Sequence, residues 1–539
     1  MFAGLMRDGR VRHLSIVAGL IALTVITFHS QARHLFSVPD RGDPLFSMWR
    51  IAWVQHQLVA DPRHLFDANI FYPLPATLTY SDAMILPAIA AWPLAWIGVH
   101  PVVAYNLVLL ATFVLSGLAA YLLVRALDLG SAAAWIAAVA FAFCTFRINH
   151  FSHLEMQMTM WMPLTLLALY RLLQTGRPRY VALTAGALAA QWYSSMYFGL
   201  FLTVYTAVFA ATLQIAWKIP LRRSALALAA FLIAGLIVFP LGMKYSRTKA
   251  IRGVRQIESV SEFSATPGDY LRPIVGPTVY RTYLPHRING ERALFPGVAV
   301  LILALIGAWP PLITTRLALI LGGLIAFDGS LGLNGLLYPL LYRLLFPFQS
   351  IRVPARFDML VTLTLAVLAA YGASRVLSRA TSRATRFVCL AALTGLLMVD
   401  SWPRYDMEPM WEAPPSIYQS LPANAVLFEF PVHPPADRFL ENVVYMYFSM
   451  WHWRPMVNGY SGFNPPQYAE TLHGTRGFPA AATLVYLKSA GVTHVTVHCR
   501  YWDATVCEAA MRQLDADTGV KRIARSDWYG APSSLYEIR

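Results

Sequence analysis

Residues 101–124 read PVVAYNLVLLATFVLSGLAAYLLV, a run without a single charged side chain. Because a helix rises about 1.5 Å per residue, this run is long enough to cross the roughly 30 Å hydrocarbon core of a bilayer. The whole chain has the same character, since 57% of its 539 residues are hydrophobic, 13% are charged and its mean hydropathy is +0.49. This composition predicts a polytopic α-helical membrane protein and excludes a soluble multidomain enzyme, a disordered chain and a disulfide scaffold.

The sequence predicts eleven membrane-spanning helices. Each is an apolar stretch with almost no charge, because unpaired backbone groups and ionised side chains are costly in hydrocarbon. The spans are expected near residues 13–29, 101–124, 131–147, 157–174, 179–194, 196–217, 224–243, 294–309, 312–328, 354–374 and 387–401. One more apolar stretch, 83–99, contains two prolines and the interfacial residues Trp92 and Trp96, so we interpret it as a segment lying at the outer interface.

The basic residues predict the orientation. The net charge of +15 would suggest nucleic acid in a soluble protein, but in a polytopic protein Lys and Arg mark cytoplasmic loops, and no nucleic-acid partner is expected. If 83–99 does not cross, the clusters around Arg125, Arg177, Arg223 and Arg379 all lie on the side of the basic N-terminus. We therefore place the N-terminus in the cytoplasm of a multi-pass protein of the cytoplasmic (inner) membrane. A cleaved signal peptide is the alternative interpretation of the first span.

This orientation predicts two domains. Residues 1–401 form the transmembrane domain, whose outer loops are 29–82, continued to residue 100 by the interfacial stretch, then 244–293 and 329–353. Residues 402–539 form an extracytoplasmic α/β domain, because strand-like runs such as AVLFEF and VTHVTVH alternate there with helical patterns. Cys499 and Cys507 both lie in this domain, where a disulfide is possible but not required.

The first outer loop gathers acidic residues in a chain that has few. They are Asp40, Asp43, Asp61, Asp67 and Asp82. Asp43 follows a span and precedes the amphipathic run FSMWRIAWVQHQL, which places its carboxylate at the level of the lipid headgroups. The alternative is that Asp43 only caps this helix, since Asp followed by Pro is a common helix start.

The second outer loop, FRINHFSHLEMQM (residues 146–158), packs polar residues between two spans. Polar clusters at a membrane edge are costly and often functional. His150 and His153 stand three residues apart, with Glu155 close by, and could bind a divalent metal. Interfacial hydrogen bonding is the favoured explanation of these residues, because two His and a Glu without a fixed third partner make a weak metal signal, and a metal cofactor stays an open alternative.

Several arginines lie in predicted outer loops, although Lys and Arg are usually concentrated in cytoplasmic loops. Arg252 and Arg255 belong to KYSRTKAIRGVRQ (residues 244–256), and Arg352 and Arg356 belong to QSIRVPARFDML (residues 349–360). Their guanidinium groups can grip phosphate oxygens through paired hydrogen bonds. Snorkelling toward the membrane surface is the alternative explanation.

Several of these stretches together resemble a known group of proteins. GDPLFSMW, LFDANIFYPLP, AYNLVLLATFVLSGLAAYLLVRAL, FRINHFSHLEMQ and IRVPARF resemble a broad group of bacterial proteins of the GT-C superfamily of membrane glycosyltransferases. The resemblance covers roughly the first 400 residues. It does not extend to the outer tail.

The resemblance implies transfer of a sugar from a polyprenyl phosphate carrier to a lipid, glycan or protein acceptor at the outer face. Asp43 matches the acid of the family's first loop, with Asp40 as the alternate, and Glu155 takes the place of the second-loop acid, where the family often has Asp. Arg252, Arg255, Arg352 and Arg356 would hold the carrier phosphate. We expect Asp82, His150 and His153 to contact the substrate.

A competing class is a non-enzymatic membrane protein that transports or assembles lipids or polysaccharides. A transporter should place ionisable residues near the middle of its spans. Here the central parts of the predicted spans are almost free of charge, and the acids and bases gather toward one face, which favours interfacial chemistry.

Overall fold

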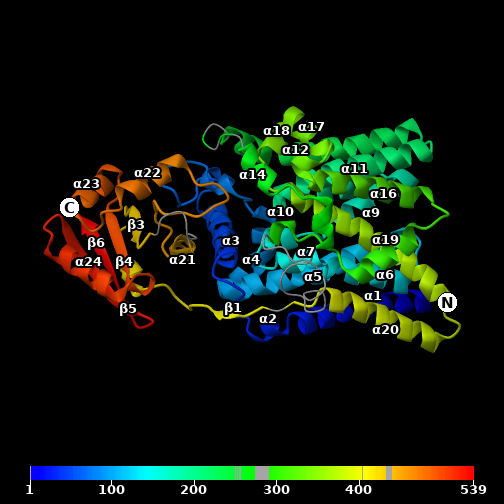
Figure 1. Cartoon of the computed structure of the whole chain (residues 1–539), viewed down its shortest axis with the longest axis horizontal. Helices are drawn as coiled ribbons and strands as arrows, with labels where there is room; N and C mark the ends of the chain where they lie inside the picture. The colour runs from blue at the N-terminus through cyan, green and yellow to red at the C-terminus, as the bar shows by residue number, and fades with distance from the viewer. Residues whose placement is uncertain are drawn as a thin grey trace. The chain divides into compact units, whose positions relative to one another are not determined.

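The computed structural model of the chain describes residues 2–248, 251, 253, 256–272, 290–403, 405–432 and 440–539. It contains two compact units, and Figure 1 shows the elements of both. The first unit comprises Met1–Arg33, Asn106–Gly242 and Val254–Asp406. The second comprises His34–Tyr105, Met243–Gly253 and Met407–Arg539, so it joins the first predicted outer loop to the tail.

The first unit is helical. Its longer helices are α1 (Phe2–Thr27), α5 (Pro101–Ala126), α6 (Ser131–Ala142), α9 (Trp161–Thr175), α10 (Arg179–Ser194), α11 (Met196–Ala216), α12 (Leu221–Arg247), α15 (Val298–Ala308), α16 (Thr314–Ser330), α19 (Asp358–Ser378) and α20 (Arg383–Asp400). Its short elements are α2 (His29–Arg33), α7 (Thr145–Asn149), α8 (Leu154–Gln157), α14 (Ile257–Glu262), η3 (Pro267–Leu271), η4 (Gly290–Arg292), η5 (Gly332–Asn334), α17 (Leu337–Leu344), α18 (Phe346–Gln349) and η6 (Pro354–Phe357). A helix therefore occupies each stretch that was predicted to span.

Fewer of these helices are long and apolar enough to cross a membrane by themselves. Within the described residues there are five such helices: Pro101–Ala126, Ser131–Asn149, Met196–Ala216, Leu221–Arg247 and Pro354–Ser378. Leu14–Thr27, Ile85–Trp96 and Val298–Ala308 are apolar but shorter. The eleven predicted spans thus remain a prediction, although the mainly helical, membrane-type architecture agrees with it.

Helix α12 shows most directly that the first unit needs lipid around it. Leu228, Leu232, Leu236 and Phe239 are each at least 60% exposed. Its central stretch, residues 224–243, carries no charge, and so many uncovered apolar side chains would be unfavourable in water but suit the hydrocarbon of a bilayer.

Helices α15 and α19 approach each other through glycines. A Cβ atom placed on Gly307 would lie 1.9 Å from the carbonyl oxygen of Leu368, and one on Gly372 would lie 2.0 Å from the carbonyl oxygen of Leu303. Only glycine allows two backbones to come this close, as at the small-residue contacts of membrane helices.

The second unit combines helices with two small sheets. Its elements are β1 (Ser37–Val38), α3 (Asp43–Ala60), η1 (Pro62–His64), η2 (Thr77–Tyr80), α4 (Ile85–Trp96), β2 (Glu408–Pro409), η7 (Ser416–Ser420), β3 (Leu427–Phe430), α21 (Leu440–Ser449), α22 (Pro466–Gly474), α23 (Ala481–Ser489), β4 (His494–His498), η9 (Cys499–Tyr501), α24 (Ala504–Ala516), β5 (Val520–Trp528) and β6 (Ala531–Ile538). Helix α4 lies in the stretch predicted to be interfacial, and its 12 residues span about 18 Å, too short to cross a bilayer.

The first outer loop and the tail pack against each other within the second unit. Strand β1 pairs antiparallel with β2, and Arg41 forms an ion pair with Glu408 over 3.3 Å. Further along, His56 of α3 stacks on Trp453 with ring centroids 4.5 Å apart. Two segments that pack so closely in one unit must lie on the same side of any membrane.

The tail contains a four-stranded sheet in the order β3–β4–β6–β5. Strands β3 and β4 are parallel, and the other neighbours are antiparallel. Figure 1 shows this sheet with α22, α23 and α24 around it. Cys499 and Cys507 form a disulfide with their Cα atoms 5.4 Å apart, which answers the question that the sequence left open.

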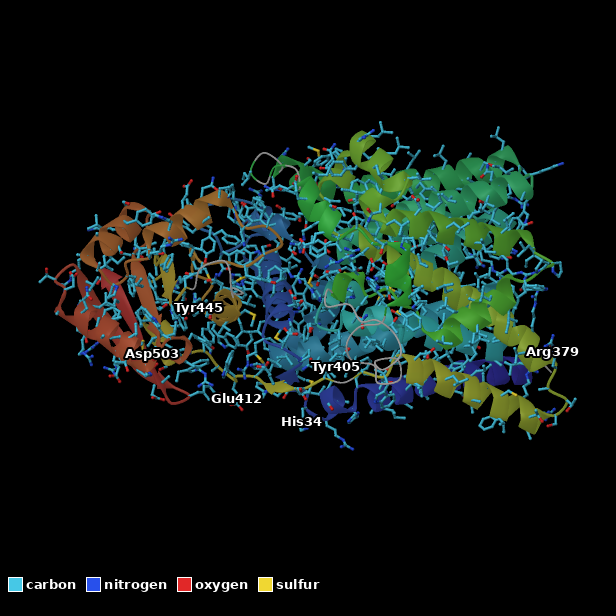
Figure 2. The ribbon with its side chains drawn as sticks, in the orientation of Figure 1. His34, Arg379, Tyr405, Glu412, Tyr445 and Asp503 are labelled. Atoms are coloured by element: carbon cyan, nitrogen blue, oxygen red, sulfur yellow. A yellow bond between two sulfur atoms is a disulfide. The ribbon has the colours of Figure 1, made fainter. Side chains whose placement is uncertain are left out.

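A buried polar network sits inside the tail's sheet. The Oε2 atom of Glu429 accepts hydrogen bonds from Tyr418 over 2.9 Å and from His498 over 2.8 Å. Burial and the neighbouring Glu429 charge raise the pKa of Tyr418 well above its ordinary value. Tyr445, which Figure 2 labels, donates a hydrogen bond to the carbonyl oxygen of Pro431. These residues are fully or almost fully buried, so we assign the network to the core.

Candidate active site

The acidic start of α3 lies in the second unit. Gly42 is the residue before the helix, and Asp43 and Pro44 open it. Asp43 is therefore the first helical residue and not the cap that the sequence suggested as an alternative. It is half-buried, and its Oδ1 atom accepts a hydrogen bond from the Tyr460 hydroxyl over 3.4 Å. A carboxylate in the first turn is stabilised by the helix macrodipole.

Tyr460 brings the tail to this end of α3. Its ring also packs edge-on against Phe46, with ring centroids 5.2 Å apart. The two residues of the Asp43–Tyr460 pair are 417 positions apart in the chain. The tail therefore contributes a hydroxyl group to the surroundings of the predicted catalytic acid.

Asp40 takes part in the turn that precedes α3. Its Oδ1 atom accepts a hydrogen bond from the backbone N–H of Gly42 over 2.9 Å, which closes the turn leading into α3. Side chains of Asp commonly stabilise turns in this way. The Asp43 carboxylate accepts its hydrogen bond from Tyr460, which belongs to the distant tail.

Arg50 lies two turns further along the same face of α3. Its guanidinium is buried, donates hydrogen bonds to the Ser47 hydroxyl over 3.1 Å and to the Asp82 carbonyl over 3.1 Å, and lies 4.1 Å from the Phe46 ring centroid. Residues 43, 47 and 50 share a helix face because of the three- and four-residue spacing. Asp82, a predicted substrate contact, is half-buried and borders this face through its backbone.

A second cluster lies in the first unit and consists of Glu291, Arg356 and His150, which we call the Glu291 cluster. The Arg356 Nε atom donates to Glu291 Oε2 over 3.0 Å, and a second Arg356 nitrogen donates to Oε1, so the pair is bidentate. His150 Nε2 lies 3.0 Å from the same Oε2 atom, and its Nδ1 lies 2.8 Å from the Phe146 carbonyl oxygen. Both ring nitrogens of His150 thus face oxygen atoms, one from a side chain and one from the backbone.

The charges in this cluster favour an ionised Glu291. Burial alone disfavours a charged carboxyl, but the positive charges of Arg356 and His150 and their hydrogen bonds outweigh burial and hold the pKa of Glu291 well below its ordinary range. The ionised Glu291 therefore acts as the shared acceptor for Arg356 and His150.

The second outer loop is held in place beside this cluster. Arg147 is fully buried and donates to the carbonyl oxygens of Ala142 and Gln157 over 2.8 and 3.0 Å. Tyr405, labelled in Figure 2, donates a hydrogen bond to the Ile148 carbonyl oxygen and so links this loop to the residues that follow α20. These contacts make Arg147 a structural residue, and they fix the position of His150.

Glu155 and His153 complete the set predicted from this loop. Glu155 is 7% exposed and close enough to Arg356 to interact with its charge. The rings of His150 and His153 lie 5.9 Å apart, centroid to centroid. Among the residues that the structure describes, however, no group of three His, Cys, Asp or Glu side chains is arranged to hold a metal ion. We therefore derive no chemical step through a metal.

The predicted phosphate-binding arginines fall into three situations. Arg356 is engaged by Glu291, as described. Arg352 is half-buried, lies 5.0 Å from the Phe263 ring centroid, and forms no ion pair with any carboxylate of the described residues. Its backbone N–H donates to the Tyr197 hydroxyl over 3.1 Å. Arg252 and Arg255 lie outside the described residues.

Three residues of these sites were missed by sequence reasoning. Glu291 lies next to Arg292 in the predicted outer loop 244–293, and an acid in this arginine-rich loop was the available signal. Arg50 is a charged residue among the apolar residues of an amphipathic stretch, and this position could have marked it as a candidate site residue. Tyr460 carried no local signal, because only the fold brings it to Asp43.

Comparison with protein families gives one match. The profile of the family described as bacterial membrane protein YfhO matches residues 90–405, which is more than half of the chain. A search of curated proteins found no match to this sequence.

Solved structures with a similar fold exist. The cryo-EM structure of the arabinofuranosyltransferase AftD from Mycobacteria has a TM-score of 0.63 and 16% sequence identity over 97% of this chain, and the chain spans only 40% of that protein. The crystal structure of the Archaeoglobus fulgidus oligosaccharyltransferase has a TM-score of 0.54 and 14% identity, covering 90% of this chain and 70% of that one. Both have the GT-C fold, so the fold expected from the sequence resemblance is confirmed.

Proposed function

Because the chain belongs to the YfhO family of bacterial membrane proteins, and because it has the GT-C fold, we propose that it is a membrane glycosyltransferase. In this proposal it moves a sugar from a polyprenyl phosphate carrier to an acceptor at the outer face of the cytoplasmic membrane. The two similar structures are, by name, an arabinofuranosyltransferase and an oligosaccharyltransferase, which supports the class of reaction but not a particular sugar.

The observation that carries the proposal is the position of Asp43. It starts α3, is half-buried, and accepts a hydrogen bond from Tyr460 of the tail. In the proposed reaction Asp43 takes the proton of the acceptor hydroxyl as that oxygen attacks the anomeric carbon. The bond from the anomeric carbon to the carrier phosphate breaks, and polyprenyl phosphate leaves with the bonding electron pair.

The leaving phosphate needs positive charge. The sequence resemblance assigns this role to Arg352 and Arg356 among the described residues, and of these two Arg352 is the better candidate, because its guanidinium forms no ion pair with a described carboxylate, whereas Arg356 is already bound by Glu291. A planar guanidinium can bind two phosphate oxygens at once. Arg356 would then act mainly by keeping Glu291 and His150 in place.

The proposed location at the outer face has two supports. The first loop and the tail pack together in one unit, so they share one side of the membrane. The tail also contains the Cys499–Cys507 disulfide, and disulfides persist in oxidising compartments outside the cytoplasm. Together with the basic N-terminus, this favours a cytoplasmic N-terminus and an extracytoplasmic tail.

The second candidate is a membrane protein that keeps the fold without catalysis. One observation favours it: in the Glu291 cluster the carboxylate is fully engaged by Arg356 and His150, as in a purely structural ion pair. This candidate predicts that lipid-linked sugars stay intact in the presence of the protein.

The test is a transfer assay with purified protein in lipid nanodiscs. Polyprenyl-phosphate-linked arabinose, mannose, glucose and galactose are offered with envelope glycans, lipids and proteins as acceptors, and released polyprenyl phosphate is measured by mass spectrometry. We expect release from at least one donor, dependent on an acceptor. Asp40→Asn should retain activity, and loss of activity there but not in Asp43→Asn would move the base to Asp40. Intact donors throughout would favour the non-enzymatic candidate.

A further inference from the structure

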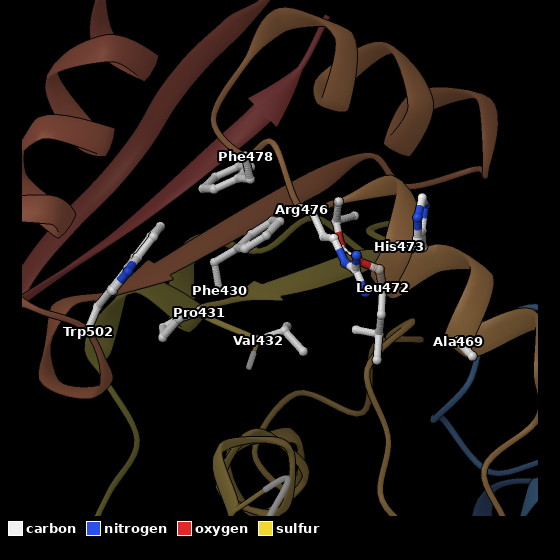
Figure 3. Close-up of a pocket in the computed structure, with 10 residues that line it drawn as sticks. Phe430, Pro431, Val432, Ala469, Leu472, His473, Arg476, Phe478 and Trp502 are labelled. Atoms are coloured by element: carbon white, nitrogen blue, oxygen red, sulfur yellow. Dashed lines mark hydrogen bonds between the residues drawn. The ribbon is translucent and has the colours of Figure 1, made fainter. Parts of the chain in front are cut away.

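A pocket of about 310 Å³ opens in the tail, at the carboxyl end of the parallel strand pair. Phe430 ends β3, Pro431 and Val432 follow it, and Trp502 follows η9, which continues directly from β4. Ligands of α/β folds commonly bind just beyond the carboxyl ends of parallel strands. Figure 3 shows the residues that line this pocket.

Aromatic rings form one wall of the pocket. Phe430 and Phe478 are stacked with centroids 3.5 Å apart, and Phe478 and Trp502 lie 6.4 Å apart with an angle of 28° between their planes. Trp502 is only partly buried, so part of its ring is available to a ligand. The faces of aromatic rings carry partial negative charge and attract the weakly positive C–H groups of a sugar ring.

Cationic and polar groups form the opposite wall. In Figure 3 Arg476 and His473 lie across the pocket from Trp502. Both are exposed, and no carboxylate of the described residues pairs with Arg476 or lines the pocket. Thr475, also in the lining, uses its hydroxyl hydrogen toward the Leu472 carbonyl and keeps oxygen lone pairs as acceptors. This wall suits an anion that also has hydroxyl groups.

We propose that this pocket binds a sugar ring that carries an anionic group, either a carboxylate or a phosphate. The aromatic wall accepts the ring, and Arg476 binds the anion through paired hydrogen bonds. The volume lies at the lower end of the range for small-ligand sites, about 300–1,000 Å³, which fits one or two sugar units and excludes a folded partner. A plain acyl chain would gain nothing from the cationic wall.

The disulfide holds the aromatic wall in position. Cys499 and Cys507 are 8 residues apart, and the loop that they close contains Trp502. Closing so short a loop restricts the backbone on both sides of Trp502. Reduction of the disulfide should therefore weaken binding of every sugar probe.

The inference goes beyond the proposed transfer and does not depend on it. Binding is measured on the full-length protein in nanodiscs by isothermal titration with three probes: methyl glucoside, methyl glucuronide and glucose 6-phosphate. We expect the two anionic probes to bind about tenfold or more tightly than methyl glucoside, because hydrogen bonds to charged groups are the stronger ones. The ratio between glucuronide and phosphate identifies which anion the pocket prefers.

Variants separate the two walls. Arg476→Ala should reduce the affinity of both anionic probes to that of methyl glucoside, whereas Arg512→Ala, a matched loss of an exposed arginine on α24, should not. Trp502→Ala should weaken all three probes about tenfold or more, and Trp502→Phe should retain most of the affinity. Asp43→Asn should bind as the unmodified protein does, so a failure of the transfer proposal leaves this test intact.

Three results would overturn the proposal. They are no saturable binding of any probe, equal binding of neutral and anionic probes, and unchanged binding by both Arg476→Ala and Trp502→Ala. If Trp502→Ala fails to fold, Arg476→Ala and Trp502→Phe still test the proposal. Both should fold, because Arg476 is exposed and Phe preserves an aromatic ring at position 502.

Discussion

Replacing Glu291 with Gln should destabilise the first unit by about 3 kcal/mol. The side chains of Glu291 and Arg356 are 17% and 10% exposed, so the pair is largely but not completely buried. Breaking a buried ion pair by removing one partner costs about 3–5 kcal/mol, because the other charge stays buried without compensation. The incomplete burial places the expected value at the lower end. Gln would also present an amide nitrogen to donors that need an acceptor.

The measurement is equilibrium unfolding in mixed micelles, followed by tryptophan fluorescence. Glu262→Gln is the matched control, because Glu262 is exposed on α14 in the same unit, and its change should stay within about 0.5 kcal/mol. The double variant Glu291→Gln/Arg356→Gln should be less destabilised than the sum of the two single variants. A Glu291→Gln protein as stable as the Glu262→Gln control would refute the reasoning.

The same pair predicts a dependence on pH. The folded-state pKa of Glu291 is held well below its ordinary value, so its contribution is complete above the ordinary carboxyl pKa of about 4.3 and is lost as the pH falls through the lowered folded-state value. The stability difference between the unmodified protein and Glu291→Gln should therefore be full at pH 5–6 and shrink toward pH 3. A difference that grows on acidification would contradict the assigned direction.

Three further predictions concern packing, the carrier and topology. Gly307→Ala should cost about 2–3 kcal/mol in the same unfolding assay, because its Cβ would lie 1.9 Å from a carbonyl oxygen of α19, whereas Gly395→Ala has open space and should be neutral or slightly stabilising. Arg352→Lys should weaken the binding of short-chain polyprenyl phosphate although the charge is kept, since Lys lacks the planar fork; unchanged affinity would reduce Arg352 to a membrane anchor. Reporter fusions after residue 402 should be active outside the cytoplasm, and a cytoplasmic signal there would remove the proposed outer-face site.

Apolar patterning was sufficient to predict the helices. A helix begins at Arg179 and ends at Ser194 where the sequence predicted residues 179–194, and α11 occupies Met196–Ala216 where 196–217 was expected. Long uncharged runs bounded by basic or proline-containing turns define such helices with little help from tertiary contacts. The number of membrane crossings was harder to predict. A short helix such as Val298–Ala308 is not long enough to cross a bilayer by itself, so its position in the membrane depends on the helices packed around it.

The sites were harder to predict because they depend on contacts between distant segments. Sequence reasoning selected Asp43 and Arg356 from their positions next to apolar stretches. The partners of these residues, Tyr460 and Glu291, are separated from them by 417 and 65 positions, and no local pattern indicates such a pairing. The pocket in the tail was not predicted at all, since one wall follows the ends of two strands that meet only in the folded sheet and the other comes from α22 and the residues after it.

The most direct test of the central claim is the rate of sugar transfer by Asp43→Asn. Single-turnover release of polyprenyl phosphate from the donor accepted by the unmodified protein is compared with release by Asp43→Asn and by Asp67→Asn, the latter being an exposed acid of the same loop. Because the general base contributes about 10²–10⁴-fold, Asp43→Asn should lose that factor while remaining folded, and Asp67→Asn should keep nearly full activity. Equal rates for the unmodified protein and Asp43→Asn would contradict the assignment of Asp43 as the base.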